Sequence, residues 1–451
     1  MTPVVMTSDP RGNNPGKVSQ AALKTLIMKI FIIGYVWPEP ESSAAGLRDW
    51  NLIETFLGAG WQVGFGCSSP ENSYSDRLRA RGISVHCLKP NDPGFDSLIR
   101  EMQPDCVVFD RFMIEEQFGW RVREQCPEAL RIIDTVDLHF LRRTRESALS
   151  AGFTLDQIKK CQFEWRTEDT LREMGAILRS DCSLVLSDYE VTHLVEQCQI
   201  PAELLHLLRF HYPAVDAPSE GAPTLKRPEF EERRDFVMIG NFRHHPNADA
   251  VRWFHKEIWP LIRSGLPEVQ VHIYGAYPPK EMMSLTNTAK GFYVKGSTPD
   301  QFATLSQYRV NLAPLRFGAG IKGKITDGWW SGTPVVGTPI SAEGMSEDLP
   351  WGGEIAQDPE DFAQKAVQLY ENRNLWQEKQ ANGFHLLQTL YSKEKNEKNL
   401  VDLVLELKRN KDSRRQKNLM GAILNHQLYR STKYFSKWIE AKSGSQVTGA
   451  R

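Results

Sequence analysis

Residues 314–345 read PLRFGAGIKGKITDGWWSGTPVVGTPISAEGM. Seven glycines surround Lys322, Lys324 and Asp327, and the stretch runs into the apolar segment TPVVGT. The pattern predicts the end of one strand, a glycine-rich loop, a short helix and then a second buried strand. Such a loop brings backbone N–H groups close to a ligand at the positive end of a helix, which favours phosphate.

The polar residues of this stretch have separate expected roles. Gly318 and Gly320 allow the backbone to approach a ligand closely, and Lys322 and Lys324 add two cations at the same place. Asp327 follows Lys324 by three residues, so it lies on the same helix face and can accept hydrogen bonds from sugar hydroxyls. A diphosphate linked to a ribose satisfies both ends of this arrangement. The alternative is a flexible turn whose lysines are simply solvated.

Outward from this stretch, short apolar runs alternate with amphipathic segments along most of the chain. Such a pattern predicts parallel sheets covered by helices on both faces, and it begins once near residue 29 and again near residue 235. The expected fold class is therefore α/β, with two doubly wound Rossmann-like domains facing a cleft and a helical C-terminal extension. The expected divisions are a disordered leader (1–24), an N-terminal Rossmann-like domain (25–210), a linker (211–234), a second Rossmann-like domain (235–375) and C-terminal helices that return to the first domain and end in a basic tail (376–451).

Composition excludes several classes of protein. The 451 residues carry a formal net charge of −1, which does not favour a nucleic-acid partner. The seven cysteines form no C-x-x-C pair, which indicates reduced thiols and a cytoplasmic protein. The apolar run near residue 30 is interrupted by Lys29 and is too short to span a bilayer.

The quoted stretch resembles the donor-binding segment of GT-B glycosyltransferases of the GT4-like group (glycosyl transferases group 1). The resemblance is carried by DGWWSGTPVVGT, by the following SAEGM with Glu343 and Gly344, and by GNFRHHPNADAVRWFHKEIWPLIR near residue 240. It implies a nucleotide-diphosphate sugar as donor, retention of configuration, and no bound metal or other cofactor. It also implies that residues 25–210 form the acceptor-side domain and that residues 235–375 form the nucleotide-sugar-binding domain. Members of the family commonly act on glycan, lipid-linked or small-molecule acceptors.

The chain departs from the family pattern at two places. Two glutamates eight residues apart are common in the family; the second, which binds the ribose, corresponds to Asp327, and the first corresponds to Ala319. Asn241 stands where a diphosphate-binding arginine is usual. The positive groups left for the diphosphate are Arg243, His244, Lys322 and Lys324.

Two segments of the first domain also carry candidate residues. Gly46 lies near the start of the helix after the first strand, where its backbone could approach the donor phosphate, and Arg48 lies one turn into that helix. Just past a later strand, the segment RIIDTVDLHF holds His139, which by resemblance contacts the donor sugar near the reacting carbon. An imidazole there can hydrogen-bond a hydroxyl or accept a proton near neutral pH. A histidine packed under the loop and a surface arginine are the structural alternatives.

Other features leave alternatives open. Arg142, Arg143 and Arg145 fit an anionic acceptor or plain solvation. Residues 408–442 hold ten Lys or Arg against two Asp or Glu, interleaved with apolar residues, and fit either peripheral membrane contact or packing on the first domain. A nucleotide-sugar epimerase and a non-catalytic nucleotide-binding protein are the rival functions, since a fold alone does not fix a function.

Overall fold

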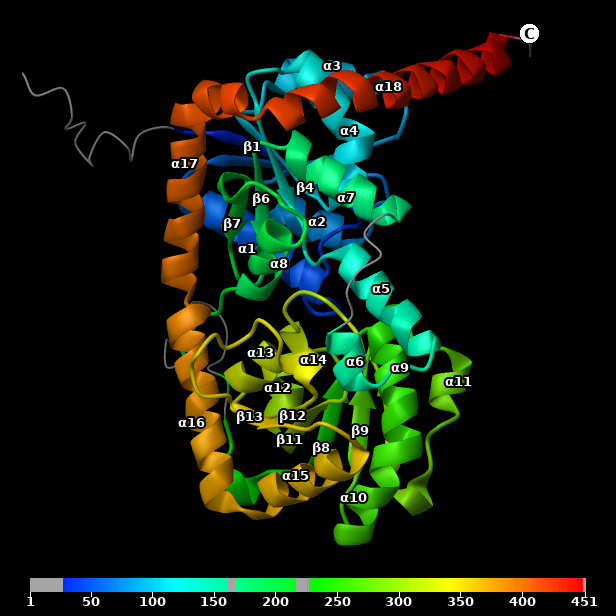
Figure 1. The fold of residues 1–451 in the computed structure, drawn as a ribbon, viewed down its shortest axis with the longest axis vertical. Coiled ribbons are helices and arrows are strands. Elements are labelled where there is room, and N and C mark those ends of the chain that lie inside the picture. Colours follow the sequence, from blue (N-terminus) through cyan, green and yellow to red (C-terminus); the bar gives the residue numbers. More distant parts are fainter. Residues whose placement is uncertain (1–26, 161–166, 216–224, 226, 449–451) are drawn as a thin grey trace, which may run out of the picture.

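The computed structural model describes residues 27–160, 167–215, 225 and 227–448. Two parallel sheets, of seven and six strands, lie one above the other and are flanked by helices (Figure 1). The prediction of two doubly wound domains with C-terminal helices is confirmed. The predicted leader (1–24) and part of the predicted linker lie outside the described residues.

The first sheet has the strand order β3-β2-β1-β4-β5-β6-β7, and all of its paired strands run parallel. Its strands are β1 (Lys29–Gly34), β2 (Gln62–Cys67), β3 (Ser84–Cys87), β4 (Cys106–Asp110), β5 (Leu130–Asp134), β6 (Cys182–Val185) and β7 (Leu205–Leu207). Its helices are α1 (Ala44–Gly58), α2 (Ser73–Ala80), α3 (Gly94–Met102), α4 (Phe112–Gln125), α5 (His139–Ser150), α6 (Leu155–Lys159), α7 (Glu168–Arg179), α8 (Asp188–Glu196) and the short η2 (Ala202–Leu204).

The second sheet has the order β10-β9-β8-β11-β12-β13, again with parallel pairs. Its strands are β8 (Arg234–Ile239), β9 (Val271–Tyr274), β10 (Phe292–Gly296), β11 (Tyr308–Ala313), β12 (Val335–Gly337) and β13 (Gly353–Ile355). Its helices are α9 (His245–Trp253), α10 (Trp259–Gly265), α11 (Lys280–Met283), α12 (Gln301–Ser306), α13 (Gly323–Trp330), α14 (Pro339–Ala342) and α15 (Pro359–Glu371), with the short η3 (Phe230–Glu232), η4 (Phe254–Ile258) and η5 (Thr288–Lys290).

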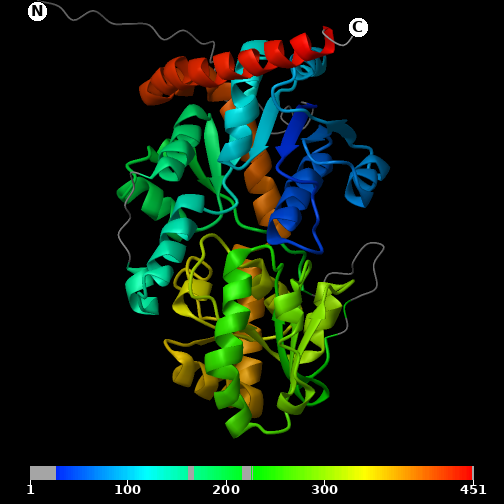
Figure 2. The same ribbon diagram turned by 90° about the vertical axis from the view of Figure 1, so that its right-hand side faces the viewer.

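The strands form where the sequence has continuous apolar runs. In β1, every residue after Lys29 is buried, because both faces of the sheet are covered by helices. The central strands β4 and β5 are buried along their whole length. Parallel strands of this kind end at one edge of the sheet, so the loops after β1, β5, β8 and β11 lie at the edges that face the other domain (Figures 1 and 2).

Three long helices complete the chain: α16 (Arg373–Leu390), α17 (Lys393–Lys417) and α18 (Leu419–Thr448). Helix α16 packs on α13 of the second domain, α17 runs along α1 of the first domain, and α18 crosses α4 and α7. Helix α18 lies at the end of the first domain that is away from the second domain (Figure 2). Within the described residues, no helix is long and apolar enough to cross a membrane.

Candidate functional site

The glycine-rich loop after β11 meets the first domain directly. A Cβ placed on Gly320 would lie 2.8 Å from the Asp137 Cβ, in the loop after β5. A Cβ placed on Gly323, the first residue of α13, would lie 2.9 Å from the Ala44 Cβ at the start of α1. The first turns of two helices, one from each domain, therefore lie against each other at the edges where both sheets end.

Two lysines lie at the start of α13. The Lys322 ammonium donates to the Gly320 carbonyl at 2.8 Å, and the Lys324 ammonium donates to the Asn247 side-chain oxygen from the first turn of α9. No side chain caps the first turn of α13. Among the described residues, no carboxylate lies within ion-pair distance of either lysine, although Glu343 and Glu190 act on Lys322 from further away. The start of the helix adds the positive end of its dipole at this place.

Burial lowers the pKa of both of these lysines. Desolvation lowers the pKa of Lys322 to about 8, although the carboxylates of Glu343 and Glu190 favour its charge. Desolvation, and then the neighbouring Lys322, lowers the pKa of Lys324 to about 7. Each lysine is thus poised to gain charge when an anion binds beside it.

Asp327 lies on the same helix, one turn further along. It is 6% exposed, and the Tyr212 hydroxyl donates to its Oδ1 at 2.6 Å. Desolvation raises its pKa to about 7, against the opposing hydrogen bond from Tyr212. The carboxylate that was predicted to face a ribose is therefore only part-ionised at neutral pH and already has one partner from the chain that crosses between the domains.

His139 begins α5, immediately after the loop that follows β5. Its Nε2 lies 3.3 Å from Asp137 Oδ1, and its ring packs edge-on to Phe112 with 5.5 Å between ring centroids. The buried Nδ1 has no hydrogen-bond partner. Desolvation lowers the pKa of His139 to about 4, so the imidazole is neutral at pH 7. The sequence-based option of a histidine that titrates near neutral pH is not what this environment produces.

The main chain around His139 is held from the first domain. Glu173 on α7 accepts the backbone N–H groups of His139 and Phe140 at 3.1 and 3.0 Å. Val136, the residue immediately before Asp137, has a φ of +61°, which a β-branched residue rarely adopts. Strained backbone of this kind is concentrated at ligand-binding and catalytic loops.

An ion pair joins the two domains beside the loop. The Arg145 guanidinium on α5 donates to both carboxylate oxygens of Glu343, at 2.7 and 2.9 Å, and also to the Gly318 carbonyl at 2.8 Å. Arg145 is 1% exposed, so it is neither solvated nor open to an acceptor. Glu190 adds a second link, because its Oε1 accepts from the Gly320 and Leu138 N–H groups at 2.8 and 3.1 Å.

The remaining predicted residues lie around this cluster. Gly344 has a φ of +70°, and a Cβ there would lie 2.6 Å from the Ser187 Cβ of the first domain. At Gly46 the space that a Cβ would need is filled by the Glu39 backbone. Arg243 is exposed, and its guanidinium stacks on Tyr277 at 3.6 Å from the ring centroid. The structure brings the loop and turn with Gly318, Gly320, Lys322, Glu343 and Gly344 against the first domain beside the segment that leads into His139. Lys324 and Asp327 lie on the same short helix α13 and contact Asn247 and Tyr212. Gly46 and Arg243 face other parts of the chain.

Some residues of the cluster carried no clear signal in the sequence. Arg145 stands in a run of arginines that resembles a solvated surface, and Glu190 follows the helix-capping Ser187 and reads as part of that cap. Arg48, considered for the cleft, instead pairs with Asp134 at 3.0 Å and is 1% exposed. Within the described residues, no group of three or more His, Cys, Asp or Glu side chains is arranged to hold a metal ion.

A comparison with known protein families agrees with the resemblance seen in the sequence. Residues 233–372 match the family model of glycosyl transferases group 1. No curated protein matches this chain by sequence comparison. The second domain is thus a glycosyl transferases group 1 domain, and the prediction of a group 1 glycosyltransferase, and hence of a transferase enzyme, is confirmed.

Solved structures share the two-domain fold. Sucrose-phosphate synthase from Thermosynechococcus elongatus is similar with a TM-score of 0.62 and 15% identity, over 84% of this chain and 99% of that chain. HepE from Anabaena, solved in complex with UDP and glucose, has a TM-score of 0.61 and 11% identity over 84% of this chain and 100% of that one. TarM from S. aureus has a TM-score of 0.63 and 11% identity over 84% and 100%. These likenesses establish the GT-B fold.

Proposed function

We propose that the chain transfers a sugar from a nucleotide-diphosphate sugar to an acceptor, with retention of configuration and without a bound metal. The observation that carries this proposal is the uncapped start of α13, where Lys322 and Lys324 have no carboxylate ion-pair partner among the described residues and where Gly320 and Gly323 lie against the first domain. A diphosphate supplies the missing negative charge at that place. The complex of HepE with UDP and glucose, which has the same fold, supports a nucleotide sugar as the ligand.

The other residues of the cluster take roles that fit their surroundings. Asp327 accepts a hydrogen bond from the ribose, with Tyr212 fixing the orientation of its carboxylate. His139 is neutral and has a free Nδ1, so it hydrogen-bonds a hydroxyl of the donor sugar rather than taking up a proton. Glu343 and Gly344 form the turn that closes on the first domain through Arg145 and Ser187.

The chemistry then depends on how the leaving group is stabilised. As the bond between the anomeric carbon and the phosphate oxygen breaks, negative charge develops on the diphosphate beside Lys322, Lys324 and the start of α13. Preorganised donors of this kind stabilise a transition state without an ion. Retention implies that the acceptor hydroxyl attacks from the face that the diphosphate leaves, with its proton passing to a diphosphate oxygen. The acceptor is a glycan, a lipid-linked molecule or a small molecule.

Donor binding and turnover test the proposal together. A thermal-shift screen of UDP, GDP, ADP and TDP should raise the unfolding midpoint for the nucleotide that the site accepts. The matching nucleotide sugars are then incubated with the enzyme in excess EDTA, with water taking the sugar in place of the unidentified acceptor. The proposal expects release of the nucleoside diphosphate. Loss of turnover in EDTA with recovery on adding Mg²⁺ or Mn²⁺ would contradict the metal-independent part.

A further inference from the structure

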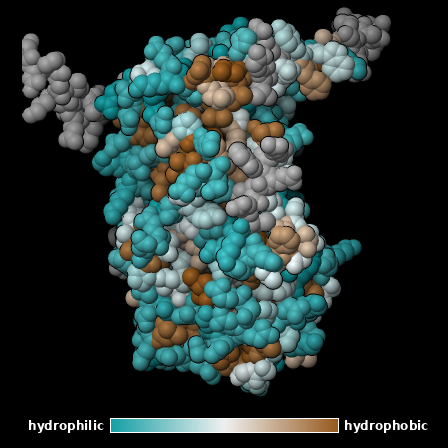
Figure 3. Space-filling model, in the orientation of Figure 1, coloured by the Kyte–Doolittle hydropathy of each residue, from teal (hydrophilic) through white to brown (hydrophobic). Residues whose placement is uncertain are grey.

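Helix α18 exposes the side chains that a surface helix normally buries. Six large apolar residues lie within one side of the helix at a period of 3.6 residues and point to solvent: Leu419, Met420, Ile423, Tyr434, Phe435 and Trp438. Phe435 and Trp438 are 62% and 56% exposed and stack on each other at 6.0 Å between centroids. Apolar surface follows the upper edge of the molecule, where α18 runs (Figure 3).

The opposite side of α18 is small or polar and packs on the first domain. Gly421 lies so close to α7 that a Cβ would be 2.3 Å from the Leu178 carbonyl. Asn425 accepts from Arg123 through its carbonyl at 2.8 Å, and Ser436 accepts from Arg121 at 3.1 Å. These contacts fix the rotation of the helix about its axis, so the apolar face is held outward rather than free to turn inward.

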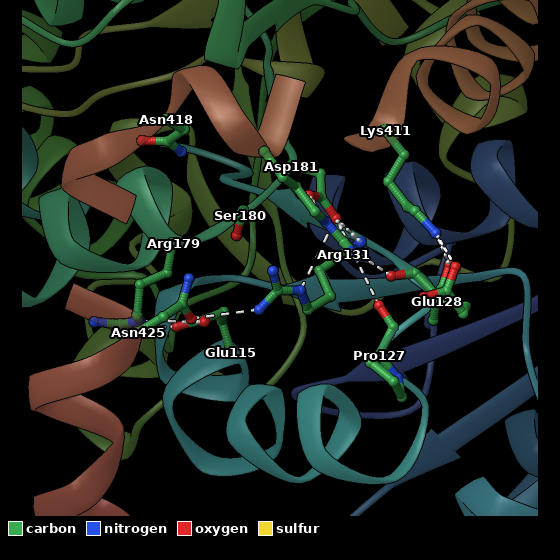
Figure 4. A network of polar contacts seen from close by, with 12 residues as sticks. Glu115, Pro127, Glu128, Arg131, Arg179, Ser180, Asp181, Lys411, Asn418 and Asn425 are labelled. Carbon is green, nitrogen blue, oxygen red and sulfur yellow. Dashed lines mark hydrogen bonds and ion pairs between the residues drawn. The ribbon is translucent and has the colours of Figure 1, made fainter. Parts of the chain in front are cut away.

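A cavity of about 680 Å³ lies between α18, the end of α17 and the first domain. Its charged lining is mostly basic, with Glu124 and Asp181 as the two carboxylates against a larger set of cations: Arg123, Arg131, Arg179, Arg414, Arg415 and Lys433. Asp181 already binds Arg415 through both oxygens at 2.7 Å, and Glu115 binds Arg179 at 2.5 Å (Figure 4). The buried Arg414 Nε has no hydrogen-bond partner.

The cavity is separate from the candidate donor site. Arg131 lies near the start of β5, and Ser180 and Asp181 immediately precede β6, so these residues belong to the amino ends of the strands. The donor loop meets the carboxyl ends of the same sheet, beside Asp137. The basic cavity therefore lies across the first domain from the proposed chemistry, mainly on the side of α18 that packs on the first domain. Tyr434 belongs both to its lining and to the exposed apolar face of the helix.

Two cations of α17 that lie outside the cavity already have carboxylate partners on the first domain. Lys408 pairs with Asp105 at 2.9 Å, and Lys411 pairs with Glu128. This part of residues 408–442 therefore packs on the protein, as one of the two sequence-based alternatives expected. Within the cavity, Lys433 pairs with Glu124, and Arg131 and Arg415 share Asp181, so the cations there outnumber their carboxylate partners. On α18, Lys437 and Lys442 are exposed.

We propose that the outward face of α18 lies on an anionic phospholipid surface and that the basic cavity binds the phosphate of a lipid headgroup. Aromatic side chains flanked by lysines are suited to the boundary between headgroups and acyl chains. Phe435 and Trp438 insert there, while Lys442, whose ammonium lies 4.7 Å from the Trp438 ring centroid, stays with the headgroups. Membrane contact at this end leaves the donor cleft open at the other.

Vesicle co-sedimentation tests the apolar face. The full-length protein is mixed with phosphatidylcholine vesicles, with and without about one third phosphatidylglycerol. Wild type should bind the anionic vesicles, and Phe435→Ser/Trp438→Ser should lower the bound fraction about tenfold. The matched control is Leu261→Ser/Met283→Ser in the second domain, which removes exposed apolar side chains elsewhere and should bind like wild type. No binding by wild type, or equal binding by the α18 variant, would overturn the proposal.

The cavity has its own test. Arg414→Gln should reduce the preference for anionic over neutral vesicles several-fold, whereas Arg409→Gln, an exposed arginine on the same helix outside the cavity, should change it far less. If inorganic phosphate raises the unfolding midpoint through Arg414 while the vesicle preference is unchanged, the cavity takes free phosphate and the lipid assignment fails.

The other partner that could cover the outward face of α18 is a second copy of the chain. Light scattering that shows a dimer dissociated by Phe435→Ser/Trp438→Ser would replace the membrane with a self-association interface. Nucleotide-induced thermal shifts should be the same in all these variants, so a failure here and a failure of the proposed function are separate results.

Discussion

Replacing Lys324 by methionine probes the proposed diphosphate contact, because the substitution keeps most of the side-chain volume and removes the charge. The structure gives Lys324 a pKa of about 7, caused by burial and then by Lys322. The lysine is therefore about nine-tenths charged at pH 6, half charged at pH 7 and about one-tenth charged at pH 8. A bound diphosphate favours the charged form, so binding takes up a proton at neutral pH.

Two magnitudes follow for the affinity of a nucleoside diphosphate. A hydrogen bond to a charged group contributes about 1.5–3 kcal/mol, so Lys324→Met should weaken binding roughly 10- to 150-fold at pH 6. Between pH 6 and pH 8 wild type loses about tenfold in the population of charged Lys324, and the variant has no such loss. The ratio of variant to wild-type dissociation constants should therefore shrink about tenfold over this range.

Calorimetry with the nucleoside diphosphate selected by the thermal-shift screen measures this ratio at each pH. Taking the ratio removes the titration of the ligand itself, since both proteins meet the same ligand. Lys256→Met serves as the control, because Lys256 is an exposed lysine of the same domain that pairs with Glu257. A ratio that stays near one at every pH would refute the diphosphate contact, and a large ratio that does not change with pH would refute the lowered pKa.

Three further substitutions separate the other roles. Asp327→Asn should weaken nucleoside and nucleoside diphosphate alike in calorimetry, by more at pH 8 than at pH 6, because a carboxyl whose pKa is raised to about 7 ionises in that interval; a loss confined to the diphosphate would contradict the ribose contact. His139→Ala should lower kcat roughly 100-fold with unchanged nucleoside diphosphate affinity. The kcat of wild type should show no titration of His139 between pH 6 and pH 8, since the pKa of His139 is about 4. A variant with the kcat of wild type would show that His139 only packs against its neighbours. Arg145→Met should lower Tm, because it leaves Glu343 buried and unpaired and so lowers the free energy of unfolding by about 3–5 kcal/mol. Adding Glu343→Gln should restore part of this loss. Equal Tm in wild type and Arg145→Met would show that the pair does not hold the domains together.

Much of the fold could be predicted because its signal is local. The central strands are apolar along their whole length, and the intervening helices are marked by capping residues such as Ser43, whose side chain accepts from the Gly46 N–H group. The edge strands β7 and β13 were not predicted, because each has three residues and is only partly buried. At an edge, burial comes from neighbours that are distant in sequence.

The candidate site could be predicted only in part, for a related reason. The glycine-rich loop and His139 stand next to strands, so their positions follow from the order of the elements. Arg145 and Glu190 bond to residues more than a hundred positions away, and nothing in their own segments indicates those partners. The orientation of α18 was equally hidden, because its outward face is set by the contacts of Gly421, Asn425 and Ser436 with the first domain.

The central claim is that this chain breaks the bond between a sugar and a nucleoside diphosphate in the cleft beside α13. Phosphorus-31 NMR of the enzyme with the selected nucleotide sugar, in excess EDTA and with water as the acceptor over a long incubation, follows that bond directly. We expect the signals of the free nucleoside diphosphate to appear with wild type and to be strongly reduced with Lys324→Met. Conversion of the sugar while it stays attached to the nucleotide would identify an epimerase, and binding without any change in the spectrum across the panel of nucleotide sugars would leave a non-catalytic protein; either result would contradict the account.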